Sequence, residues 1–138
     1  MTGSTTSDPL SPARKVVLVL RSWRWFVTTW VRLRRRPIPA VVRELASVGR
    51  PSSSSVRPVR LGRVVGRSLG VGPWRARCLY TSIVLYRLLR EQGDEPELVI
   101  GLPLEPKDRD AHAWVELGGR DVGPPPGRGR HVELARYA

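Results

Sequence analysis

The chain has a single cysteine, Cys78, among its 138 residues. One cysteine excludes an internal disulfide framework and a cysteine-rich zinc site, and it is typical of a reducing compartment, so we expect a cytoplasmic location. Long apolar runs are also missing. The run over residues 16–20 meets Arg21 and Arg24, well short of the roughly 20 apolar residues that a membrane-spanning helix needs. No transmembrane segment, metal site or cofactor is predicted, and a nucleotide requirement is left open.

Acidic residues are scarce in the first half of the chain. Residues 1–77 hold 16 Lys and Arg against 2 acidic residues, whereas residues 78–138 hold 8 against 10. Such a field favours an anionic partner, which is nucleic acid, a membrane surface or an acidic peptide. Lysine is scarce too, with 22 Arg against 2 Lys, so a codon bias explains the charge as well as phosphate recognition does. No recognition helix or aromatic-basic sheet is recognisable, and nucleic-acid binding is not predicted.

The first half of the chain predicts a tail, a helical extension and a linker. Residues 1–12 are small, polar and interrupted by proline, which predicts a disordered tail. Residues 13–48 predict a basic helical extension, with one helix over residues 13–36 and a short one over residues 39–47. The low-complexity stretch over residues 49–56 is the predicted linker to a domain that spans residues 57–138.

The second half predicts a helix that begins near Cys78 and packs on a small antiparallel sheet. Residues 74–92 carry the clearest helical pattern, and a short helix weakened by Gly62 and Gly66 precedes it. Strands follow, with a hairpin turn at Gly118-Gly119. Their predicted ranges are 97–102, 111–117 and 120–123, and a last apolar segment, 131–138, either pairs or frays. The predicted fold class is α+β.

Cys78 and His112 form the candidate catalytic pair. The positive end of a helix favours the thiolate of a cysteine in the first turn. A histidine on a neighbouring strand can hold the pair as thiolate and imidazolium and then protonate a leaving amine. Each residue also has a structural interpretation, because a lone cysteine on an apolar helix face is more often a small hydrophobe and a lone histidine a satisfied polar group. His131 has no predicted role.

These segments resemble a known family. The order of a cysteine-led helix, a strand, a histidine strand and a further strand is the core plan of the transglutaminase-like and papain-like superfamily. Within it, RCLYTSIVLYRLLREQG, LVIGL, AHAWVEL and GRDVG, which fall between residues 77 and 123, resemble the lasso peptide biosynthesis B protein, a stand-alone leader peptidase. The resemblance covers about residues 57–123. It implies a transglutaminase-like core in which Cys78 and His112 are catalytic.

The resemblance also implies a reaction and its partners. As a cysteine protease, the chain would cut the peptide bond between leader and core in a ribosomally made precursor peptide, with Cys78 attacking and His112 serving as base and acid. A separate leader-recognition protein and an ATP-dependent lasso cyclase are implied as partners. Two alternatives stay open: a catalytically impaired homologue, and a basic module whose helix over residues 13–36 docks a membrane surface or an anionic partner.

The third catalytic group departs from the family pattern. The family usually places an Asp after a Val-Gly pair that follows the histidine strand, and this chain has Pro124 there. Asp121 is the nearest substitute and is the provisional third catalytic residue. However, a two-residue turn pairs Asp121 with Glu116, which is roughly 13 Å from His112 at about 3.3 Å per residue.

Other groups can orient the imidazole in place of Asp121. A shifted strand register would bring Asp121 closer to the ring. Asp110 could take its place, and so could a backbone carbonyl or an amide that supports a cysteine–histidine dyad.

Overall fold

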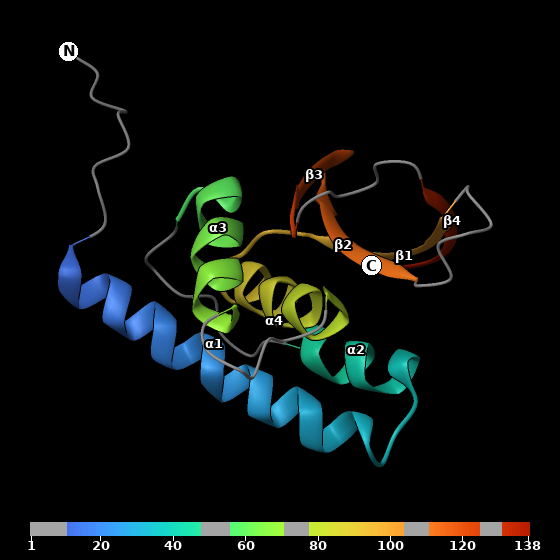
Figure 1. Ribbon diagram of the computed structural model, residues 1–138, viewed down its shortest axis with the longest axis horizontal. Helices are drawn as coiled ribbons and strands as arrows, with labels where there is room; N and C mark the ends of the chain where they lie inside the picture. The colour runs from blue at the N-terminus through green and yellow to red at the C-terminus, as the bar shows by residue number, and fades with distance from the viewer. Residues whose placement is uncertain (1–10, 48–55, 71–77, 104–110, 125–130) are drawn as a thin grey trace.

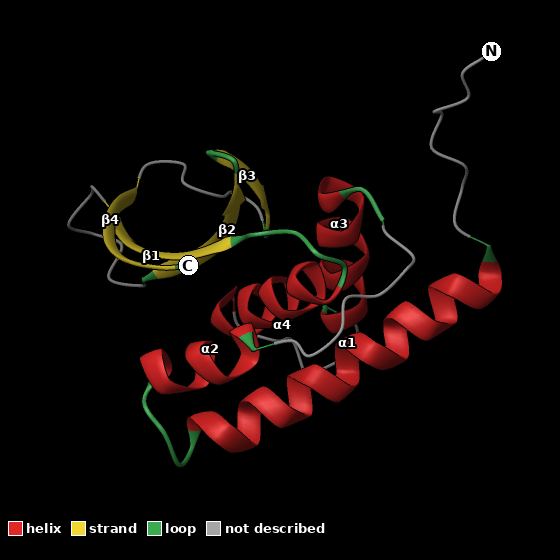
Figure 2. Ribbon diagram, turned by 180° about the vertical axis from the view of Figure 1, so that it is seen from behind, coloured by secondary structure: helices red, strands yellow, loops and turns green. Residues whose placement is uncertain are grey.

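The computed structural model describes residues 11–47, 56–70, 78–103, 111–124 and 131–138. Its helices are α1 (Pro12–Leu33), α2 (Ile38–Ala46), α3 (Pro58–Leu69) and α4 (Cys78–Glu91), and its strands are β1 (Glu97–Pro103), β2 (His112–Leu117), β3 (Arg120–Gly123) and β4 (His131–Tyr137). The strands form one antiparallel sheet in the order β3-β2-β1-β4. The sheet is curved, and the helices lie on its convex side (Figures 1 and 2). The predicted α+β class is confirmed.

Helix α4 is the centre of the fold. It packs against α1, α2 and α3 on one side and against β1 and β2 on the other. A helix that is surrounded in this way needs apolar side chains on all of its faces. The sequence supplies them, and the following are fully buried: Ile83, Val84, Leu85, Tyr86, Leu88 and Leu89.

The predicted helical extension shares the core with the rest of the chain. Leu18 of α1 and Val41, Val42 and Leu45 of α2 lie in the same hydrophobic cluster as α3, α4 and the sheet. A small domain buries a limited fraction of its surface, so two further helices add a large share of the core. The extension over residues 13–48 is therefore part of the folded body, and the predicted linker does not separate two cores.

The ends of the helices differ from the predicted ones by a few residues. Helix α1 begins at Pro12, after the Ser11 hydroxyl accepts a hydrogen bond from the Arg14 backbone N–H. The predicted disordered tail over residues 1–12 is therefore too long by two residues, while residues 1–10 lie outside the described part. Helix α1 also ends at Leu33, three residues before its predicted end. Residues 48–55, which hold most of the predicted linker, are outside the described part as well.

The register of the β2–β3 hairpin is the predicted one. Gly118 and Gly119 both have positive φ, 60° and 81°, which a two-residue hairpin turn of this kind requires. The turn pairs Leu117 with Arg120 and Glu116 with Asp121. At the other edge of the sheet, the last segment pairs with β1 as strand β4, and its end is held by the Tyr86 hydroxyl, which donates to the Ala138 carbonyl at 2.7 Å.

Helix α3 comes into direct backbone contact with β3 at Gly62. A Cβ atom added at Gly62 would lie 2.1 Å from the Val122 carbonyl oxygen, whereas one added at Gly66 would meet nothing within 4 Å. The sequence showed both glycines only as weak points of a helix. The structure gives Gly62 a role, because the bare Cα lets α3 approach the strand that leads to Pro124.

Replacing each glycine by alanine should therefore have effects of opposite sign. Gly62→Ala is expected to lower the free energy of unfolding by at least about 2 kcal/mol, since backbone must move to admit the methyl group. Gly66→Ala is expected to raise it by about 0.5–1 kcal/mol through helix propensity. Urea unfolding of both variants checks this, and equal effects of the same sign would contradict the close approach.

Candidate active site

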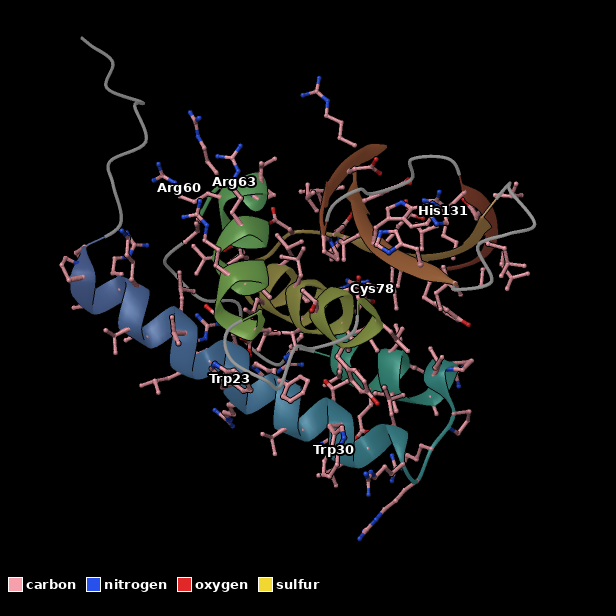
Figure 3. The ribbon with its side chains drawn as sticks, viewed as in Figure 1. Trp23, Trp30, Arg60, Arg63, Cys78 and His131 are labelled. Carbon is pink, nitrogen blue, oxygen red and sulfur yellow. The ribbon has the colours of Figure 1, made fainter. Side chains whose placement is uncertain are left out.

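Cys78 is the first residue of α4, and its side chain is partly exposed. The thiol Sγ lies 4.0 Å from the backbone carbonyl oxygen of Ala111, the residue that precedes β2. Figure 3 shows Cys78 between the start of α4 and the sheet. The first turn of a helix has backbone N–H groups without intrahelical partners and the positive end of the helix dipole. Both can stabilise an anionic group of a molecule bound at this end of the helix.

A single cleft contains both Cys78 and His112. Its volume is about 670 Å³, which is within the usual range for a ligand site. Four elements contribute to it: the first residue of α2, the start of α4, β1, and the first residues of β2 with the residue before them. Among the described residues, the rest of the lining is apolar and consists of Ile38, Leu79, Ile100, Ala111 and Ala113.

The thiol and the imidazole reach this cleft from different sides of the sheet. Successive residues of a strand point to opposite faces, so Val115 packs in the core below the sheet while His112 shares the other face with Trp114. The His112 and Trp114 rings are stacked, with centroids 5.8 Å apart. Nε2 of His112 is buried and has no hydrogen-bond partner among the described residues. Both residues line the cleft, and no hydrogen bond joins the thiol to the imidazole in the described part of the chain.

The backbone of Pro124 lies beside the His112 imidazole and acts on its pKa through a hydrogen bond. Proline has no backbone N–H, so the hydrogen bond between the two residues must use the Pro124 carbonyl as acceptor. Nε2 has no partner among the described residues, which leaves Nδ1 as the nitrogen that can donate to this carbonyl. A neutral imidazole that donates from Nδ1 carries its lone pair on Nε2. The arrangement therefore leaves Nε2 ready to accept a proton.

A family model for the transglutaminase-like superfamily matches residues 17–135. The chain belongs to the transglutaminase-like superfamily. The match begins in α1 and ends in β4, so it includes the helical extension that the sequence suggested lies outside the catalytic core. No curated protein and no solved structure is detectably similar to the chain.

Asp121 lies away from the imidazole of this transglutaminase-like protein. It is exposed on β3, opposite Glu116, and Glu116 is roughly 13 Å along β2 from His112 at about 3.3 Å per residue. The geometry therefore does not bring Asp121 to the imidazole, and the group that acts on the His112 ring is the backbone of Pro124. Asp110, the other carboxylate considered, lies outside the described residues.

His131 is a second histidine at the site, and the sequence interpretation missed it. It is the first residue of β4, and its ring centroid lies 5.2 Å from that of His112 and 6.1 Å from that of Trp114. It reaches this position because Pro103 of β1 pairs with it across the sheet. Since this pairing joins distant parts of the chain, the local sequence held no signal for it beyond the presence of a histidine.

The surroundings of His112 lower the pKa of its imidazole below the ordinary value of 6.5. Burial is the largest cause, and the neighbouring His131 lowers the pKa further, while the hydrogen bond to the Pro124 carbonyl opposes both. The lowered pKa favours the neutral imidazole, which is the form that can accept a proton.

Trp114, on which His112 stacks, is held by a buried carboxylate. The indole Nε1 donates to Glu116 Oε2 at 2.8 Å, and Arg136 Nη2 donates to Glu116 Oε1 at 3.0 Å. Arg136 also pairs with Glu97 and Glu133 at 3.2 and 2.6 Å, and these carboxylates raise its pKa. The network fixes the tryptophan and so the surface that supports the imidazole.

The described residues contain neither a metal-binding cluster nor a membrane-spanning helix. No group of three or more His, Cys, Asp or Glu in that part of the chain is placed to hold a metal ion. Nor is any helix described here long and apolar enough to cross a membrane.

Removing Arg136 should destabilise the protein far more than removing its exposed partner. Arg136→Met leaves the Glu116 carboxylate buried without a cation, and we expect a loss of about 2 kcal/mol or more in the free energy of unfolding. Glu133→Gln leaves the Arg136–Glu116 pair in place and should cost under about 1 kcal/mol. Thermal or urea unfolding of the two variants checks this, and comparable losses would contradict a central role for Glu116.

Proposed function

We propose that this transglutaminase-like protein is a cysteine peptidase that removes the leader from a ribosomally synthesised precursor peptide during lasso peptide maturation. The observation that carries the proposal is the cleft shared by Cys78, in the first turn of α4, and His112, whose Nε2 is buried and unpartnered among the described residues. A buried polar atom without a partner is uncommon and calls for an explanation. Proton transfer to and from Nε2 supplies one.

The chemistry follows from the state of each group. Nε2 of His112 takes the thiol proton as Cys78 Sγ attacks the carbonyl carbon between leader and core, while Nδ1 keeps its hydrogen bond to Pro124. The unpaired backbone N–H groups at the start of α4 can stabilise the oxyanion. The imidazolium then protonates the departing amine of the core, which leaves the leader as a thioester. Water attacks the thioester, His112 takes a proton from it, and the leader carboxylate and free thiol are regenerated.

A backbone carbonyl in the place of the family's aspartate can still orient the base, but it stabilises the charged imidazolium less. The carbonyl fixes the tautomer of His112, which is the main task of the third group. It has no full negative charge, so it stabilises the imidazolium less than a carboxylate does. This supports an active peptidase with a slower proton-transfer step, and it is also the observation that favours the second candidate, a catalytically impaired homologue.

The specific substrate and the partners rest on the resemblance of the AHAWVEL and cysteine-helix segments to lasso leader peptidases. The precursor peptide is the proposed substrate, and a separate leader-recognition protein delivers it. The freed core amine is the nucleophile that a lasso cyclase then needs. The largely apolar lining of the cleft suits an uncharged stretch of peptide chain around the cut.

Cleavage of a precursor peptide by single-residue variants tests the proposal. In the presence of the leader-recognition protein, Cys78→Ala and His112→Ala should each lower the cleavage rate by about a thousandfold or more, since each removes a group that reacts. Asp121→Asn is the matched control and should stay within about threefold of wild type, because the exposed carboxylate contributes nothing to proton transfer. Cleavage that survives Cys78→Ala, or that Asp121→Asn abolishes, would contradict these assignments.

The pH dependence should report the contact between the two histidines. Cleavage needs neutral His112, so the rate is lost as the pH falls through the lowered pKa of this group, below 6.5. His131→Gln removes a neighbour that lowers this pKa, and we expect the acidic limb of the kcat/KM profile to move to higher pH. An unchanged limb with unchanged folding would show that His131 does not influence the base.

A further inference from the structure

Helix α1 turns two hydroxyl side chains toward the core together with apolar ones, and it also turns aliphatic side chains toward solvent. Ser22 and Thr29 are both fully buried, beside Leu18. The Ser22 hydroxyl donates to the Leu18 carbonyl at 2.7 Å, and Thr29 Oγ1 has no partner in the described part of the chain. An amphipathic surface helix normally has charged and polar side chains on its outer side, so the aliphatic residues on the outer side of α1 depart from the usual pattern.

The exposed apolar residues of α1 form one band. Val16, Leu20, Val27, Trp30 and Val31 make up this band, which we call the outer stripe, and the exposed Val17 and Val19 flank it. At about 100° per residue, the four aliphatic members fall within an arc of roughly 60°, on the side opposite to the buried residues. The packing of α1 against α2, α3 and α4 explains why its inner side is buried. It does not explain why apolar residues lie in the outer stripe. Large contiguous apolar patches on a protein surface usually mark an interaction site.

Exposed cations lie around the outer stripe. Arg14 and Lys15 are at its beginning, Arg24 is beside its middle, and Arg34 and Arg35 follow its end. Helix α1 contains no acidic residue. The guanidinium groups of Arg24 and Arg34 lie over the rings of Trp25 and Trp30, at 5.4 and 3.9 Å from the centroids. The surface is thus aliphatic along its centre and cationic around it.

Two other cations of α1 are engaged within the fold. Arg21 pairs with Glu91 of α4, and Arg32 pairs with Glu44 of α2. Both partners belong to helices that pack against α1. The fold thus uses some of the arginines to hold α1 in place, whereas the cations around the outer stripe pair with no carboxylate among the described residues.

We propose that the outer stripe seats the protein on an anionic phospholipid surface, with α1 lying in the plane of the interface. Aliphatic side chains and a tryptophan would enter the boundary of the acyl chains while the flanking arginines meet phosphate groups, as at other interfacial helices. A second copy of this chain is a poor occupant, because two stripes packed together would bring like charges close. Nucleic acid fits the cations but leaves the aliphatic band without a partner.

The arrangement of the elements suits such an orientation. Helix α1 runs along one edge of the molecule, and the sheet lies on the far side of α4, in both opposite views (Figures 1 and 2). A surface bound to the outer stripe therefore leaves the sheet turned away from the lipid. The proposal is independent of the peptidase chemistry, since none of its residues lines the cleft of Cys78.

Vesicle co-sedimentation of the full-length protein tests the proposal. We expect binding to phosphatidylcholine vesicles that contain phosphatidylglycerol, little binding to pure phosphatidylcholine, and release by added salt. The variant Leu20→Ser/Val27→Ser should bind about tenfold more weakly or worse. Its matched control is Leu134→Ser/Val132→Ser, which removes equally exposed side chains from β4, since Leu20 and Leu134 are both 64% exposed and Val27 and Val132 are 53% and 54% exposed.

The results of the vesicle assay test the lipid-binding surface separately from the proposed peptidase activity. Binding that the control pair weakens as much as the stripe pair would overturn the assignment of the surface. A wild-type protein that does not bind anionic vesicles would also overturn the proposal. Cys78→Ala should bind vesicles like wild type, so a failed peptidase assay and a failed vesicle assay are distinguishable. Circular dichroism and thermal unfolding of each variant show whether the fold is kept.

Discussion

The burial of α4 between the other helices and the sheet determines where the thiol and the imidazole lie. Because α4 is apolar on every side, it cannot rotate or slide without exposing fully buried residues such as Leu85 and Leu89. Its first residue, Cys78, is therefore fixed beside the start of β2, next to the Ala111 carbonyl. The histidine that follows Ala111 then opens onto the same cleft. The candidate site is thus a consequence of core packing, and the α1 and α2 helices contribute to that packing.

A backbone carbonyl in place of an aspartate changes how the base is controlled. With Pro124 as acceptor, burial and the nearby His131 prevail, and the pKa of His112 is lowered. In the proposed reaction, the imidazole starts as the neutral base, and charges separate only when substrate and oxyanion donors are present. The buried Glu116 serves the same site indirectly, because it holds Trp114 against the imidazole through its bond to the indole. The His112 imidazole thus has neutral groups next to it, the Pro124 carbonyl and the Trp114 ring, and the charged Glu116 acts on it only through Trp114.

Local sequence patterns predicted the parts of the structure that depend on residues close together in the sequence. The periodicity of α4, the placement of Cys78 in its first turn and the register that follows from Gly118-Gly119 depend on residues a few positions apart. His131 and Pro124 could not be assigned in this way, because they meet His112 only through strand pairing and chain reversal. The family's Asp position drew attention to a side chain, whereas the group that contacts the ring is a main-chain oxygen. Periodicity also showed that α1 is apolar without showing which of its two apolar sides faces the core.

The central claim is that the thiol of Cys78 becomes acylated by the leader and that His112 makes this step fast. Acid quenching of the wild-type protein during turnover of a precursor peptide, followed by intact and peptide mass spectrometry, tests it most directly. The account predicts a mass increase equal to the leader acyl group, located on the peptide that contains Cys78 and absent from Cys78→Ala. Rapid leader cleavage by the wild-type protein without any adduct on Cys78, or with an adduct on another residue, would contradict it.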